Sequence, residues 1–261
     1  MSAVQAVLLF LCHWLEYLGL LGGLGSFVVR RLGRNRPRLE WANPPMHLAF
    51  GAAVVGGLGV LLLGSLHGPS TWFVLARVLC EAAALAICLR GRPAVAPFAV
   101  LAAILLAFSG HASAQQPAAG AEFADAIHVL SAGMWAGGIM ALATLRPPDG
   151  WNGAEAMKLL ERFGRVAVIA FGVTALTGVL RATEQLNLLS TDLWTTTYGI
   201  VLVLKTTGVL VMLASSFAWR RGLNAARVEA AVVVVVVAAT ALLATLPAPA
   251  PGVAVMDLVH H

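Results

Sequence analysis

Two histidines lie three residues from a carboxylate, and both pairs fall inside long apolar stretches. His13 precedes Glu16, and His128 follows Asp125. Residues three apart share one face of a helix, so each carboxylate can reach its histidine. Ionisable side chains are costly in hydrocarbon and usually mark a functional site there. An imidazole that is oriented by a carboxylate, which also raises its basicity, is what a metal or haem site needs.

Other polar residues are expected at a similar depth, in the same half of the membrane. They are Arg77, Glu81, Tyr198, Lys205, His67 and His111. Arg77 and Glu81 share a helix face, either as part of a site or as a buried ion pair that specifies packing. His67 and His111 are expected at the outer mouths of their helices. The other half of the spans is almost purely apolar, so we predict a polar cavity open to one side of the membrane.

The elements that position these residues are predicted from composition. The chain has 261 residues, of which 59% are hydrophobic and 11% charged. Apolar runs of about 20 residues match the thickness of a bilayer as helices, and backbone in lipid must hydrogen-bond within its own segment. We therefore expect an all-α polytopic membrane protein in a lipid bilayer. Eight transmembrane helices are predicted, at roughly 5–29, 46–66, 71–89, 94–110, 122–145, 163–186, 197–219 and 228–247.

Basic residues gather in the four loops that follow the first, third, fifth and seventh predicted helices. The positive-inside rule places these loops in the cytoplasm and both termini in the periplasm of a bacterial inner membrane. Because the basic residues lie at helix ends rather than on one face, the net charge of +5 does not indicate a nucleic-acid partner. Cys12, Cys80 and Cys88 form no CxxC pair and are expected to be small buried side chains.

The two ends of the chain need separate interpretation. The first apolar stretch has no basic segment before it and is too long for a signal peptide, so we interpret it as a first span. The final LVHH resembles a vector remnant, so His260 and His261 are given no function.

The two halves of the chain resemble each other, which predicts an internal duplication. His13 precedes Gly22 by nine residues, and His128 precedes Gly137 by nine residues, in each case at a Gly-Gly pair. The second helix carries LAFGAAVVGG, and the sixth carries IAFGVTALTG. We predict two parallel four-helix repeats, residues 1–120 and 121–261, with sites at their interface. His13 and His128 would then lie at similar depth and face each other.

Four stretches carry a resemblance to a known family. They are SGHAS at 109–113, IHVLSAGMWAGGIMAL at 127–142, RFGRVAVIAFGVTALTG at 162–178 and TTTYGIVLVLKTTGVLV at 195–211. In this order they resemble the CopD family of bacterial copper-resistance membrane proteins. The resemblance implies an inner-membrane protein that handles copper from the periplasm, often beside a small periplasmic copper-binding partner. It marks as positions of interest His111, His128, Trp135, Tyr198 and Lys205.

Copper uptake or handling is the first functional hypothesis. His67 and His111 would collect the ion at the mouth, and His13 and His128 would bind it at depth. Glu16 and Asp125 would orient these histidines or balance charge, because Arg77 and Lys205 would otherwise repel the cation. The residues expected to surround the ligands are Glu81, Trp135 and Tyr198. Imidazole and carboxylate suit Cu(II) better than Cu(I), which prefers soft ligands.

A b-type haem is the alternative cofactor. With it the protein would be a membrane redox protein that passes electrons, and a Cu(II) reductase is one form of this alternative. The haem would lie between His13 and His128, with the Gly-Gly pairs making room for the flat macrocycle. Arg77 and Lys205 would pair with its propionates. A third alternative is a structural or chaperone-docking subunit without any cofactor, and an absorption spectrum with metal analysis would separate the three.

Overall fold

The computed structural model describes residues 2–64, 69–108, 118–185, 194, 196–219 and 226–245. These residues form eight helices and no strand. The helices are α1 (Ala3–Gly33), α2 (Met46–Leu63), α3 (Pro69–Leu89), α4 (Ala96–Phe108), α5 (Ala118–Ala143), α6 (Ala154–Gln185), α8 (Thr197–Trp219) and α9 (Ala226–Thr245). The expectation of an all-helical chain is confirmed for the described residues.

Six of these helices are long and apolar enough to cross a membrane: α1, α2, α3, α5, α6 and α9. The apolar part of α4 and the Gly199–Ser215 part of α8 are shorter, at 10–17 residues. Apolar side chains such as Leu62, Ile169 and Trp72 lie exposed on the outside of the bundle, at 82%, 71% and 71% exposure. Exposed apolar surface on this scale is expected where lipid surrounds a protein, which supports a helical membrane protein.

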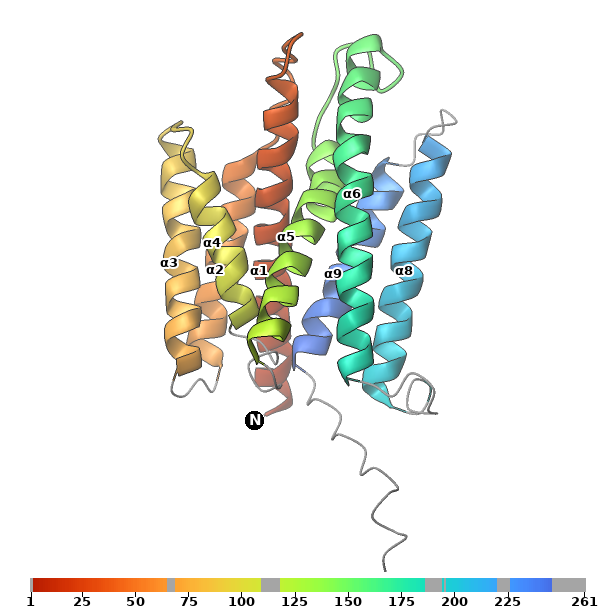
Figure 1. The fold of residues 1–261 in the computed structure, drawn as a ribbon. Coiled ribbons are helices and arrows are strands. Elements are labelled where there is room, and N and C mark those ends of the chain that lie inside the picture. The colour runs from red at the N-terminus through yellow and green to blue at the C-terminus, as the bar shows by residue number, and fades with distance from the viewer. Residues whose placement is uncertain are drawn as a thin grey trace, which may run out of the picture.

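The helices run alternately up and down, with the first four on one side of the bundle and the last four on the other (Figure 1). α1 and α5 run in the same direction and pack together in the middle. On one side α1 packs against α2, and α3 against α4; on the other side α5 packs against α6, and α8 against α9. The halves also exchange contacts, because α4 packs against α5 and α9 packs against α1.

Glycines set how closely α1 approaches its neighbours. A Cβ on Gly25 would meet the backbone of Gly137, and one on Gly137 would meet the Leu21 carbonyl, so the α1 and α5 backbones touch there. On the other face of α1, a Cβ on Gly19 would meet the backbone of Ala53 in α2. Small residues permit such close helix contacts in membranes, and these contacts fix the rotation of α1 between α2 and α5.

The eight helices match the predicted ranges within a few residues, except at the start of α6. That helix begins at Ala154, nine residues before the predicted start at 163. Its first turns are not an apolar run, but they bury Ala156 and Leu159 at 1% and 0% exposure. The prediction followed hydropathy and therefore missed a helical extension that packs on protein rather than in lipid.

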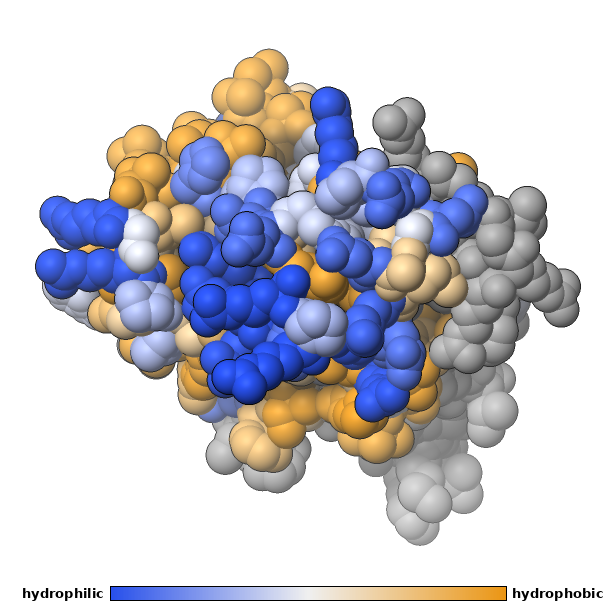
Figure 2. All heavy atoms as spheres, turned by 90° about the horizontal axis from the view of Figure 1, so that it is seen from above, coloured by the Kyte–Doolittle hydropathy of each residue, from blue (hydrophilic) through white to orange (hydrophobic). Residues whose placement is uncertain are grey.

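One end of the bundle is strongly hydrophilic. Seen from above, polar residues cover the middle of this end, with apolar side chains around them (Figure 2). This is the end where α1 finishes with Arg30 and Arg31 in its last turn. His13 and Glu16 lie in the other half of α1, about ten residues from its start and therefore roughly 15 Å along the helix.

Candidate functional site

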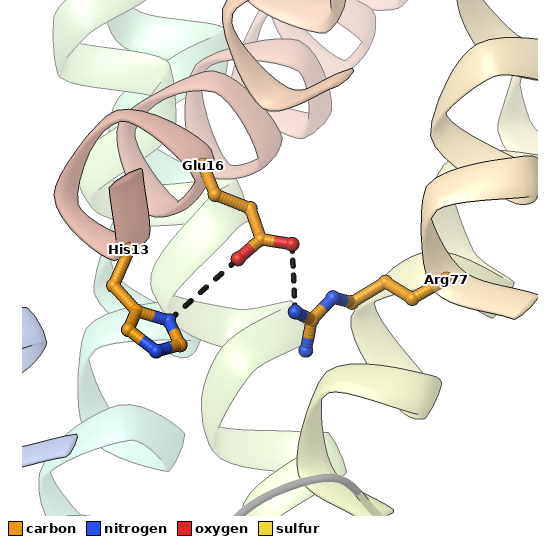
Figure 3. A network of polar contacts seen from close by, with 3 residues as sticks. All are labelled: His13, Glu16 and Arg77. Carbon is orange, nitrogen blue, oxygen red and sulfur yellow. Dashed lines mark ion pairs between the residues drawn. The ribbon is translucent and has the colours of Figure 1, made fainter. Parts of the chain in front are cut away.

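Three fully buried charged residues meet between α1, α2 and α3. Glu16, Arg77 and Glu81 are 0%, 1% and 0% exposed. Arg77 Nη2 lies 2.7 Å from Glu16 Oε1, and His13 Nδ1 lies 3.8 Å from Glu16 Oε2 (Figure 3). Glu16 therefore lies between the imidazole and the guanidinium, and each of its two oxygens faces one of them. We call His13, Glu16, Arg77 and Glu81 the first polar cluster.

Gly57 in α2 makes room for the two carboxylates of this cluster. A Cβ on Gly57 would lie 2.9 Å from Glu16 Oε1 and 3.0 Å from Glu81 Oε2, so the two carboxylates are close neighbours. Arg77 acts electrostatically on both of them. The two oxygens of Glu81 are buried and have no hydrogen-bond partner among the described residues. With a neutral imidazole, the cluster holds two acidic groups for one fixed positive charge.

His13 is the member of the cluster that reaches the surface. Its side chain is 18% exposed, and its ring lies 5.7 Å from the ring of Tyr17 between centroids. Its Nδ1 atom is buried and has no hydrogen-bond partner in the described part of the chain. An imidazole nitrogen in this position is available to a ligand or a proton that enters beside Glu16.

His128 belongs to a second cluster, formed by α5, α6 and α8. Its Nδ1 lies 3.0 Å from Thr177 Oγ1, and its ring would be 3.4 Å from a Cβ on Gly178. Lys205 of α8 is near enough to act electrostatically on the ring. One turn along α5, Ser131 accepts a hydrogen bond from Thr174 at 2.8 Å. His128, Thr177 and Lys205 form the second polar cluster.

His13 and His128 do not meet across the α1–α5 contact. Gly133 and Gly137 of α5 lie against Leu24 and Leu21 of α1, whereas His128 contacts Thr177 of α6. Nine residues are about two and a half helical turns, so His128 and Gly137 lie on opposite faces of α5. The expectation that the two histidines face each other is therefore not met in the geometry.

The Gly-Gly pair of α5 is also filled rather than open. A Cβ on Gly137 would meet the α1 backbone, and one on Gly138 would meet the ring of Phe163. The space expected there for a flat macrocycle is occupied by protein. The Gly-Gly pair of α5 therefore does not provide that space, and a haem between His13 and His128 stays a prediction.

The remaining candidate residues are distributed around these clusters. Asp125 is buried on α5 at 7% exposure. Trp135 is 5% exposed and packs edge-on against Phe171, with 4.9 Å between ring centroids. Tyr198 is in α8, but its side chain is outside the described residues, and so are His67 and His111. Trp135 has the surroundings of a core residue between α5 and α6.

Sequence reasoning missed the hydroxyl groups of α6 and one buried carboxylate. Thr174 and Thr177 are three residues apart in VTALTG, a spacing that places both on the face toward α5. That spacing was a usable signal. Glu229, in the first turn of α9, is 1% exposed; its position at a predicted helix end gave no indication of burial.

No three His, Cys, Asp or Glu side chains in the described ranges are grouped so that they could hold a metal ion. The first polar cluster offers one imidazole and two carboxylates, but Arg77 lies among them. No protein-family model, curated protein or solved structure matches the chain. The resemblance to the CopD family therefore rests on the sequence stretches alone, and the two polar clusters are the structural features that bear on function.

Proposed function

We propose that this protein handles copper in a bacterial inner membrane, taking the ion from the periplasm for uptake or resistance. The observation that supports this is the first polar cluster, in which His13, Glu16 and Glu81 place one imidazole and two carboxyl groups beside a single fixed positive charge, that of Arg77. A cation that enters beside His13 would find nitrogen and oxygen ligand atoms there. Buried charges in a membrane are paired or serve ions and protons, and Arg77 alone leaves the second carboxylate available to the cation.

The ligand types favour a cargo site over a permanent metal centre. One imidazole and one or two carboxylates suit Cu(II). A site on a transport pathway must bind well enough to load and weakly enough to release, and a partial ligand set fulfils both conditions. His128 and Thr177 would form the corresponding position in the second half of the chain.

The proposed topology has eight spans, arranged as two parallel four-helix repeats with both termini in the periplasm. It is supported by the positive-inside rule and by the basic residues at the end of the bundle where α1 finishes, among them Arg30, Arg31, Arg34 and Arg38. The His13 end of α1 then opens toward the periplasm. A small periplasmic copper-binding protein is the partner that would deliver the ion there.

The test of this function is a copper titration of the full chain purified in detergent, with metal analysis and an absorption spectrum. We expect stoichiometric Cu(II) binding and no Soret band. His13→Ala should abolish most of this binding, and Glu16→Gln should weaken it about 10- to 100-fold, the usual cost of losing a group that orients a ligand.

His47→Ala is the matched control, because His47 is exposed in the first turn of α2 at the other end of the bundle. Copper binding that survives His13→Ala but is lost in His47→Ala would overturn the proposed site. A Soret band in protein purified after haem supply would replace copper with haem as the cofactor.

A further inference from the structure

The hydrophilic end of the bundle contains a cavity of about 610 Å³ between the end of α1 and the loop that follows it. Four arginines line it, namely Arg30, Arg31, Arg34 and Arg38. The only acidic residue in the lining is Glu40. We call this cavity the arginine pocket. It lies at the far end of α1 from the first polar cluster, so it is a separate feature of the molecule.

The loop that forms the pocket is held in place by an arginine from another helix. Arg162 of α6 donates to the carbonyl oxygens of Leu32, Asn35 and Arg36 at 2.9, 3.3 and 3.0 Å. Leu39 N donates to Gly33 O at 2.8 Å, and Leu39 and Ala42 are buried at 4% and 3% exposure. The backbone that carries Arg34 and Arg38 is therefore fixed by hydrogen bonds and packing.

Among the described residues, Glu40 is the one acidic group in the lining, so most of the positive charge of the pocket is uncompensated. None of its four arginines forms an ion pair with a carboxylate among the described residues. Arg30, Arg31 and Arg34 also border a small neighbouring cleft that contains Arg92 of the α3–α4 connection. The guanidinium groups on this concave surface thus come from two segments of the chain, the end of α1 with its following loop and the α3–α4 connection.

We propose that the arginine pocket binds a phosphate-bearing anion. Guanidinium groups match phosphate oxygens through pairs of parallel hydrogen bonds, and four of them around one cavity exceed what an isolated surface charge provides. Under the proposed topology the pocket lies at the cytoplasmic membrane surface, where basic pockets between helices bind lipid headgroups. The phosphate can belong to an anionic phospholipid or to a soluble compound, and the two sources are separated by experiment.

The lipid experiment measures retention of phosphatidylglycerol on the detergent-purified full chain by native mass spectrometry, with phosphatidylcholine, a zwitterion without net charge, as the comparison. The test variant is Arg34→Gln with Arg38→Gln, and the matched control is Arg90→Gln with Arg146→Gln, two exposed arginines outside the pocket that form no ion pair among the described residues. We expect phosphatidylglycerol affinity to fall about 10- to 30-fold in the test variant and to stay unchanged in the control.

The soluble-phosphate experiment measures the shift of the thermal unfolding temperature with pyrophosphate against chloride at equal ionic strength. A shift in the parent protein that is lost in the test variant, without selective phosphatidylglycerol retention, would assign the pocket to a soluble phosphate compound. Arg34→Lys with Arg38→Lys keeps the charge but removes the paired hydrogen bonds. This variant should therefore bind less tightly than the parent to whichever of the two compounds, phosphatidylglycerol or pyrophosphate, the parent protein binds.

Three results would overturn the proposal. The first is an equal loss in the test and control variants, because that would show general surface charge to be the cause. The second is full binding by the lysine variant, which would exclude a role for the guanidinium geometry. The third is no selective effect in either experiment while size-exclusion chromatography shows the test variant to be folded.

Discussion

At the scale of single residues, Arg77 is the group on which the buried charges of the first polar cluster depend. It lies 2.7 Å from Glu16 and acts electrostatically on Glu81. Arg77→Met should destabilise the protein by about 3–5 kcal/mol, because it leaves buried carboxylates without a compensating charge. The measurement is reversible unfolding in mixed detergent micelles, with the exposed Arg165→Met as the control.

A second substitution tests whether charge, rather than packing, causes that loss. Adding Glu16→Gln to Arg77→Met removes one of the uncompensated carboxylates while keeping its shape. Part of the lost stability should return. If the double variant were less stable than Arg77→Met alone, the contribution of Arg77 would lie in the packing of its long side chain.

Glu81 should affect stability and copper binding in opposite directions. Its oxygens are buried without a hydrogen-bond partner in the described residues, which is costly when no ligand is bound. Glu81→Met, which removes both oxygens and keeps the length of the side chain, should therefore raise the unfolding temperature of the copper-free protein and weaken copper binding about 10-fold or more. Unchanged copper affinity, measured by titration of the more stable variant, would exclude Glu81 from the cation site.

At the scale of helices, the α1–α5 contact depends on the absence of side chains at the crossing. Gly137→Ala should cost about 1–3 kcal/mol, because its Cβ would press on the α1 backbone at Leu21. Gly172→Ala is the matched control, since a Cβ there meets nothing within 4 Å. Both variants are compared by thermal unfolding, and equal stabilities would show that the two helices adjust freely.

Hydropathy was sufficient to predict the helices, because apolar runs of bilayer length have few other solutions. It did not predict their rotation, which depends on contacts such as Gly25 with Gly137. The nine-residue spacing from His128 to Gly137 already placed these residues on opposite helix faces. If the glycines are assumed to mark the contact between α1 and α5, this spacing predicts that His128 lies on the other face of α5, toward α6.

The buried partners of the ionisable residues were predictable only within one helix. Glu16 beside His13 follows from their three-residue spacing. The ion pair from Arg77 to Glu16 joins residues of different helices, and no pattern in a single sequence determines that pairing. Thr177 as the partner of His128 likewise requires knowledge of which helices pack together.

At the scale of the whole molecule, the two polar clusters support the proposed duplication. In each half, a basic residue of the third helix acts on the histidine of the first helix, Arg77 on His13 and Lys205 on His128. In each half, a glycine of the second helix also borders the cluster, but the neighbours differ, because Gly57 lies beside the carboxylates of Glu16 and Glu81 and Gly178 lies beside His128. The proposed duplication would relate these two clusters, one in each half.

The proposed orientation of the molecule predicts which loops are accessible from the periplasm. After Cys12, Cys80 and Cys88 are replaced by alanine, single cysteines at Ser113 and Asn152 are labelled with a membrane-impermeant thiol reagent in intact spheroplasts. Ser113 lies outside the described residues, in a stretch of sequence without Lys or Arg, whereas Asn152 is exposed just before α6 at the basic end. The positive-inside rule predicts labelling at Ser113 only. In lysed cells both positions should be labelled in either orientation, which is the control. Labelling at Asn152 alone in intact spheroplasts would show the opposite orientation, in which the His13 end faces the cytoplasm and the periplasmic route for copper is excluded.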